Sequence, residues 1–166
     1  KILGDMLKNL SSNIRAADAK STKPIINNPN VGSAEALFSI AATLRQGAAG
    51  IDLAHMFISM AIYQNPQYDL AKILLADILE SREMYADANE VYDSISKAYY
   101  TVQLKKANNL VMMEDYNGAE LLLKSLALDS GNYQLYLDLG DILRMKNKPE
   151  EAIKYYLQAL KRLPKI

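Results

Sequence analysis

The sequence predicts an all-α fold in which antiparallel helix pairs stack one after another into a solenoid. First, apolar residues recur at helical spacing from residue 34 onward, in runs of about 12 to 15 residues separated by short polar turns. Second, the second helix of each expected pair carries an alanine anchor, at Ala54, Ala88, Ala119 and Ala152, with spacings of 34, 31 and 33 residues. A helix–turn–helix period near 34 residues is typical of solenoid proteins.

The composition is that of a folded protein without disulfide or thiolate chemistry. Of 166 residues, 50% are apolar and 23% are charged, and there is no cysteine. No apolar run approaches the roughly 18–20 residues of a membrane span. The net charge is zero but uneven: +3 in residues 1–33, −8 in 34–143 and +5 in 144–166. The acidic middle argues against a nucleic-acid partner. The basic end is interpreted either as a solvated helix end or as a surface for an acidic partner.

Residues 1–33 are expected to form a segment of their own. Apolar residues at Ile2, Met6, Leu10 and Ile14 favour a helix over 1–20, and the prolines and asparagines of 21–33 favour an extended or looped stretch. Because the first residue is not methionine, the chain is interpreted as a mature form or as a piece of a longer protein.

Residues 34–166 are expected to hold four helix pairs. Gly47–Gly50 separates the first two helices, and Asn65-Pro66 closes the first pair. Asn132 is a candidate N-cap for the last pair, whose own turn is Lys146–Pro149. Glu150 and Glu151 suit a helix start. The expected helices span 34–46, 52–64, 68–81, 85–97, 99–113, 118–128 and the two runs of 133–164.

The last pair resembles the tetratricopeptide repeat. That motif requires a large residue, Leu-Gly, a large residue, Ala, an aromatic residue, Ala and Pro at set spacings. The matching residues are Tyr136, Leu139, Gly140, Leu143, Ala152, Tyr156, Ala159 and Pro164. Residues 34–66, 69–98 and 99–131 follow in register, with departures at Lys72, Gln103 and Lys106. The chain is also similar to tetratricopeptide proteins of bacteria, some of which are exported, so its compartment stays open.

The resemblance implies a right-handed superhelix of about four repeats, with a concave groove lined by the first helix of each pair. One position of that helix is apolar in all four units, and acidic or amide residues follow it in three. The lysine and asparagine clamp of chaperone-tail adaptors is absent. A groove of this kind suits a peptide or helix with apolar anchors. The candidate partner-binding residues are Phe38, Arg45, Ile73, Asp77, Glu80, Leu104, Asn108, Met112, Leu137, Asp141, Arg144 and Met145.

Nothing in the sequence predicts an enzyme, a cofactor or a metal site. His55 is the only histidine, no glycine-rich phosphate loop occurs, and no nucleophile–base arrangement is recognisable. Two functions therefore remain. The first is a non-enzymatic scaffold that binds a protein or peptide partner in its groove. The second is a structural or oligomerisation module of a larger protein, with residues 1–33 covering part of the groove.

The end of the array bears on this choice. Ile153, Leu157 and Leu160 form an apolar stripe for which the sequence offers no capping helix. Pairing of C-terminal ends, and hence a homo-oligomer, is one expectation from that stripe. The identity of any partner cannot be predicted from the sequence.

Overall fold

The structure, a computed structural model, describes residues 28–97, 99–130 and 132–164. These residues form α-helices, one short 3-10 helix and no strand. The elements are α2 (Pro29–Leu44), the 3-10 helix η1 (Ala48–Gly50), α3 (Ile51–Gln64), α4 (Asp69–Glu80), α5 (Tyr85–Asp93), α6 (Tyr100–Met112), α7 (Tyr116–Ser130), α8 (Tyr133–Met145) and α9 (Pro149–Arg162).

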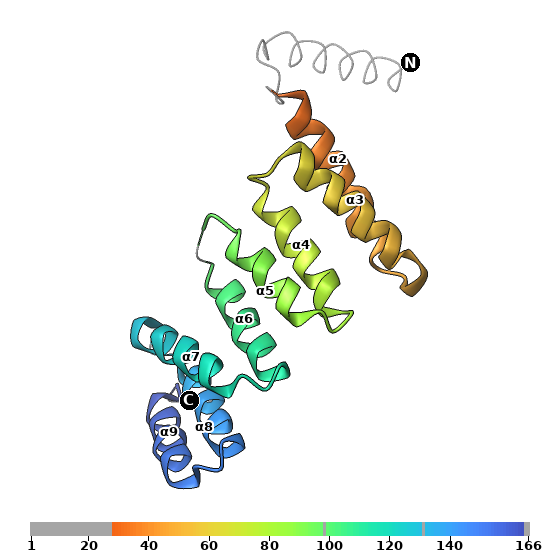
Figure 1. Ribbon diagram of the computed structural model, residues 1–166. Coiled ribbons are helices and arrows are strands. Elements are labelled where there is room, and N and C mark those ends of the chain that lie inside the picture. Colours follow the sequence, from red (N-terminus) through yellow and green to blue (C-terminus); the bar gives the residue numbers. More distant parts are fainter. Residues whose placement is uncertain (1–27, 98, 131, 165–166) are drawn as a thin grey trace, which may run out of the picture.

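The helices form an α-solenoid of four antiparallel pairs (Figure 1). The pairs are α2–α3, α4–α5, α6–α7 and α8–α9, and they follow one another along the molecule. Neighbouring pairs meet where the second helix of one packs on the first helix of the next, at α3–α4, α5–α6 and α7–α8. The predicted all-α fold and its four helix pairs are therefore confirmed.

Each pair crosses at small residues that are almost completely buried. On the first helices these residues are Ala41, Ala76, Ala107 and Gly140, and on the second helices they are Ala54, Ala88, Ala119 and Ala152. A Cβ atom at Gly140 would lie 2.3 Å from Cε1 of Tyr156, so only glycine fits the present position of that ring. The small residues thus set how closely the two helices of a pair approach.

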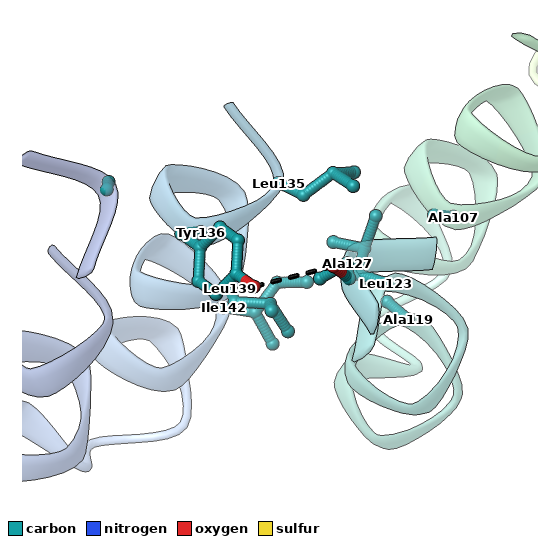
Figure 2. Packing of buried hydrophobic residues seen from close by; sticks show 9 residues of the cluster. Ala107, Ala119, Leu123, Ala127, Leu135, Tyr136, Leu139 and Ile142 are labelled. Atoms are coloured by element: carbon teal, nitrogen blue, oxygen red, sulfur yellow. Dashed lines mark hydrogen bonds between the residues drawn. The ribbon is translucent and has the colours of Figure 1, made fainter. Parts of the chain in front are cut away.

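Larger side chains fill the space between neighbouring pairs. Figure 2 shows one such cluster, in which Leu135, Leu139 and Ile142 of α8 pack towards Leu123 and Ala127 of α7. The hydroxyl of Tyr136 donates to the carbonyl oxygen of Ala127 at 3.4 Å and so keeps its polar end satisfied inside the cluster. Each pair therefore completes its core only through the next pair.

The first helix begins earlier than the sequence pattern predicted. Residues 29–33 were expected in the N-terminal extended segment, but α2 starts at Pro29. The Asn28 side chain accepts a hydrogen bond from the backbone N–H of Asn30, and proline is tolerated in the first helical turn. The proline was interpreted as a loop signal when it is in fact part of a helix start. The remaining predictions for the N-terminal segment concern residues 1–27, which lie outside the described residues.

The fourth helix of the array ends earlier than predicted, at Asp93 rather than at residue 97. Lys72 on α4 is 8% exposed, and its ammonium group donates to the carbonyl oxygen of Ser94 at 2.6 Å. Asp69 accepts hydrogen bonds from the backbone and the hydroxyl group of Ser96. These contacts satisfy the chain after α5 outside a helix. They also explain why Lys72 stands where the repeat motif has a large apolar residue.

The turns inside the last three pairs each contain one non-glycine residue with a positive φ angle. Glu83, Glu114 and Asn147 have positive φ angles of 61°, 61° and 56°. Each lies seven residues after the small residue of its first helix. The backbone of these turns therefore repeats although their sequences differ. None of the described helices is both long enough and apolar enough to cross a membrane.

The contact between Gly140 and Tyr156 predicts that the effect of Gly140→Ala on stability depends on the residue at position 156. In the wild-type chain, Gly140→Ala should cost roughly 1 kcal/mol, because overpacking of about 1–3 kcal/mol exceeds a helix-propensity gain of about 1 kcal/mol. In the Tyr156→Leu background, which reproduces the Ala107–Leu123 pair of the preceding unit, the same change should stabilise the chain. Urea unfolding of the four proteins measures this cycle, and equal effects in both backgrounds would contradict it.

The positive φ angle of Glu114 predicts a stabilising substitution. Glu114→Gly should raise the free energy of unfolding by about 1 kcal/mol, because an L-residue in this conformation is strained by roughly that amount. Glu114→Ala is the matched control, since it removes the charge but keeps the Cβ atom, and it should give no comparable gain. Thermal unfolding followed by circular dichroism distinguishes the two variants.

Candidate functional site

The apolar positions predicted to line the groove are partly buried. Phe38, Ile73, Leu104 and Leu137 each lie three residues before the small residue of their helix. Each packs at the edge of a core cluster, and the Phe38 ring lies 5.3 Å from the ring of Tyr68. We call these four residues the apolar row. Because part of each side chain stays accessible, the row joins the core to the surface of the first helices.

A charged cluster connects three successive pairs. Asp77 on α4 lies 3.2 Å from Arg45, which directly follows α2, and 2.8 Å from the ammonium group of Lys105 on α6. Lys105 also lies 3.0 Å from Glu80. The structure thus brings the predicted residues Arg45, Asp77 and Glu80 together and adds Lys105. Two carboxylates face two cations, so the cluster is electrically balanced.

Uncharged donors lie beneath this cluster. The Tyr92 hydroxyl, from α5, lies 3.0 Å from Glu80 and 3.3 Å from Asp77, and the Asn109 amide donates to Glu80 at 3.0 Å. Burial, together with the charges of Glu80 and Asp77, raises the pKa of Tyr92 far above its ordinary value, so the phenol remains a neutral donor. Partial burial alone would lower the pKa of Lys105, but its hydrogen bonds to Asp77 and Glu80 raise it. Both Tyr92 and Lys105 therefore remain protonated hydrogen-bond donors to the carboxylates.

The last pair repeats this arrangement in part. The Tyr156 hydroxyl donates to Asp141 at 2.9 Å. These two residues are fifteen positions apart in the sequence, as are Tyr92 and Asp77. Arg144 lies 3.6 Å from Asp141 on the same helix and is exposed. In the part of the chain that the structure describes, no following helix supplies a cation equivalent to Lys105. Asp141 and Arg144 are therefore more open to solvent than Asp77 and Glu80.

Two methionines expose apolar surface beside the row. Met112 and Met145 each lie five residues after the small residue of their helix, and they are 60% and 49% exposed. Asn108 is also exposed on α6, whereas Leu137 turns partly into a groove between α8 and α9. Flexible thioether side chains of this kind adapt to differently shaped apolar ligands.

The residues of the charged cluster that the sequence analysis missed are Lys105, Asn109 and Tyr92. The contact of Tyr92 with Asp77 could have been predicted, because Tyr92 follows Asp77 by the same number of residues as Tyr156 follows Asp141. His55 lies elsewhere, at the α3–α4 junction, where its Nδ1 is 3.3 Å from Arg82. Among the described residues, no group of three acidic, histidine or cysteine side chains could hold a metal ion.

The similarity of the chain to known proteins is one of structure. No protein-family model matches the chain, and no curated protein matches it. Several solved structures, however, do match the chain. A crystal structure of MamA is 16% identical, covers 95% of this chain and 91% of that chain, and has a TM-score of 0.68. Residues 41-end of MamA from Desulfovibrio magneticus RS-1 are 14% identical, with coverages of 81% and 76% and a TM-score of 0.67.

A third similar structure carries a functional description of its own. YrrB, described as a tetratricopeptide repeat protein with an unusual peptide-binding site, is 15% identical over 76% of this chain and 66% of that chain, with a TM-score of 0.61. At such identities the likeness concerns the fold. Together with the buried small residues and the four helix pairs, it shows that the described residues adopt the tetratricopeptide-repeat fold.

Proposed function

We propose that the protein is a non-enzymatic scaffold that binds a peptide or helix of a partner protein along the face of its first helices. The observation that carries this proposal is the apolar row, which recurs at one position of α2, α4, α6 and α8 and stays partly accessible in each. Ion pairs between successive units give this face a fixed register. The peptide-binding site described for YrrB, which has the same fold, supports the proposal.

The electrostatics favour a ligand recognised by apolar anchors. Asp77 and Glu80 are already paired with Arg45 and Lys105, so a basic residue of the ligand would have to displace an existing partner. Met112 and Met145 offer exposed apolar surface on two neighbouring first helices. Asp141 and Arg144 are the charged pair best placed to contact polar groups of a ligand, because both are exposed. The ligand proposed is therefore an extended or helical segment with spaced apolar side chains.

The alternative is a structural or oligomerisation module in which the part of the N-terminal segment that precedes α2, residues 1–27, covers part of this face. Its support is in the sequence: the N-terminal segment is basic (+3), whereas residues 34–143 are acidic (−8). Removal of residues 1–27 separates the two functions. Under the alternative, the shortened chain should bind peptides more strongly and unfold at a lower temperature than the full chain. Under the scaffold proposal, both quantities should change little.

The exposed methionines provide the direct test of peptide binding. Peptides selected from a random display library on the full chain should bind at least about tenfold more weakly to Met112→Asp/Met145→Asp, a loss of about 1.4 kcal/mol. The reason is that the substitution places charge on the apolar contact surface without disturbing the core. Isothermal titration calorimetry with the selected peptides measures the difference.

The control for this experiment is Leu121→Asp/Leu128→Asp, which changes two leucines of α7 that are 74% and 86% exposed. These residues lie on a second helix, and the control should bind like the wild-type chain. Equal loss of binding in both double variants, or undiminished binding in the methionine variant, would overturn the proposed binding face.

A further inference from the structure

The outer side of α3 carries an apolar stripe that lies open to solvent. Its four residues follow one another at spacings of three, four and three positions, and they are 48%, 49%, 48% and 83% exposed: Leu53, Met56, Met60 and Tyr63. Because a helix turns once in 3.6 residues, these spacings place all four side chains on one side of α3. We call these residues the α3 stripe. A contiguous exposed apolar surface of this kind marks a contact site.

The stripe is particular to the first pair and is not a property of the repeat. The equivalent positions of the other second helices, counted from the anchor alanine, are also exposed or partly exposed. They are polar in α5 (Asp87, Glu90, Ser94 and Lys97) and in α9 (Glu151, Lys154, Gln158 and Lys161), and they are mixed in α7 (Gly118, Leu121, Ser125 and Leu128). Since the stacking of pairs leaves these positions uncovered, it does not explain why they are all apolar in α3.

The sequence that precedes α2 has an apolar pattern of matching spacing and length. Its apolar residues alternate spacings of four and three positions: Leu3, Leu7, Leu10, Ile14 and Ala17. Leu7 and Ala17 are ten residues apart, as Leu53 and Tyr63 are, which corresponds to about 15 Å of helix. In a helix, the charged residues up to position 15 fall on the opposite side: Lys1, Asp5, Lys8 and Arg15. Two apolar stripes with this spacing favour helices packed side by side at roughly 20°.

The chain joins this sequence to the end of α3 at which the stripe finishes. Because α2 and α3 are antiparallel, the start of α2 and the end of α3 lie at the same end of the first pair (Figure 1). Residues 18–28 connect to that end and are long enough to span up to roughly 35 Å. The exposed apolar side chains of α7 and α9 lie two and three pairs further along the array (Figure 1). The α3 stripe is therefore the large exposed apolar surface nearest to this sequence.

Two other neighbours of the first pair fit these observations less well. The outer side of α2 presents one large exposed apolar side chain, Ile40, beside Ser39 and Thr43, whose hydroxyl groups donate to carbonyl oxygens of α2 itself. A membrane surface favours basic residues beside an apolar stripe, whereas the only charged residue of α3 is Asp52. The α3 stripe thus suits an uncharged apolar helix face better than it suits lipid.

We propose that residues 1–20 form a helix that packs along the outer side of α3 and covers the α3 stripe. The connection through residues 18–28 makes this helix parallel to α3. In parallel packing the matched spacings give the register: Leu7 with Leu53, Leu10 with Met56, Ile14 with Met60, and Ala17 with Tyr63. The smallest apolar residue of the segment then lies beside the largest residue of the stripe, and the charges up to position 15 face solvent.

This contact goes beyond the proposed function and does not depend on it. The α3 stripe belongs to a second helix, whereas the apolar row and the exposed methionines belong to first helices. A segment held on α3 adds to stability without competing for the face of the first helices. Removal of residues 1–27 should then lower the unfolding temperature while peptide binding changes little, so peptide binding is the quantity that separates the scaffold from its alternative.

A double-mutant cycle on the full chain measures this contact through stability. Leu10→Asp and Met56→Asp should each lower the unfolding temperature by about 2–4 °C, because each places a charge in an apolar contact. The double variant should be no less stable than the weaker single variant, because the contact is already lost. Leu121→Asp on α7 is the control, and its effect should add to that of L10D. Additive effects of L10D and M56D, or no loss from either one, would overturn the proposal.

Cross-linking locates the segment directly. Because the chain has no cysteine, a pair of introduced cysteines reports one contact at a time. Leu10→Cys/Met56→Cys should form an intramolecular disulfide on mild oxidation at least about tenfold faster than Leu10→Cys/Glu90→Cys, because proximity raises the effective concentration of the two thiols. Glu90 is the matched control, since it occupies on α5 the position that Met56 occupies on α3.

Two further cysteine pairs identify the other places where the segment could lie. Leu10→Cys/Ile40→Cys samples the outer side of α2, and Leu10→Cys/Ala42→Cys samples the face of the first helices. Faster disulfide formation in either pair than in L10C/M56C would place the segment there and exclude the contact with α3. A covalent dimer as the main product of L10C/M56C, even in dilute solution, would assign the stripe to a second copy and equally overturn the proposal.

Discussion

The close crossing of the two helices in each pair is the constraint on which the rest of the structure depends. Eight alanine or glycine residues, two in each pair, are buried at these crossings. Each removes the side-chain volume that would hold the helices apart. The apolar faces so created are too large for one pair to bury, so each pair needs the next. The repeat distance of the solenoid follows from these positions.

A consequence of this close stacking is that residues in or next to successive first helices come within side-chain reach. Arg45, Asp77 and Lys105 belong to three different units, yet they meet in one cluster. A charged cluster of this kind contributes little net stability where it is exposed, but it fixes the register of neighbouring units. Because its charges are already paired, the apolar row and the exposed methionines are the groups on this face that remain available to a ligand.

The sequence predicted what is local and periodic in this fold. The anchor alanines, the number of helix pairs and the row of apolar positions all follow from spacing along the chain. The early end of α5 could not be predicted, because it depends on the contact of Lys72 with Ser94, 22 residues away. The pairing of Asp77 with Lys105 spans 28 residues and depends on how two units stack. The prediction of where α2 starts failed for a different reason, since Pro29 suits a loop as well as a first helical turn.

The internal junctions and the outer side of α9 differ in polarity, because the second helices make polar contacts at the junctions whereas α9 presents Ile153 and Leu157. Internal junctions join parts of one chain, so the loss of translational and rotational freedom is small, and polar contacts such as Glu120 with Lys146 can serve mainly to fix register. An intermolecular junction must also offset an association cost of about 4–15 kcal/mol. Polar pairs contribute little towards that cost, whereas apolar burial contributes about 25 cal/mol per Å². On α9, Ile153 and Leu157 stand at positions that are polar in the other second helices, so a contact on this face would be stabilised by apolar burial rather than by polar pairs.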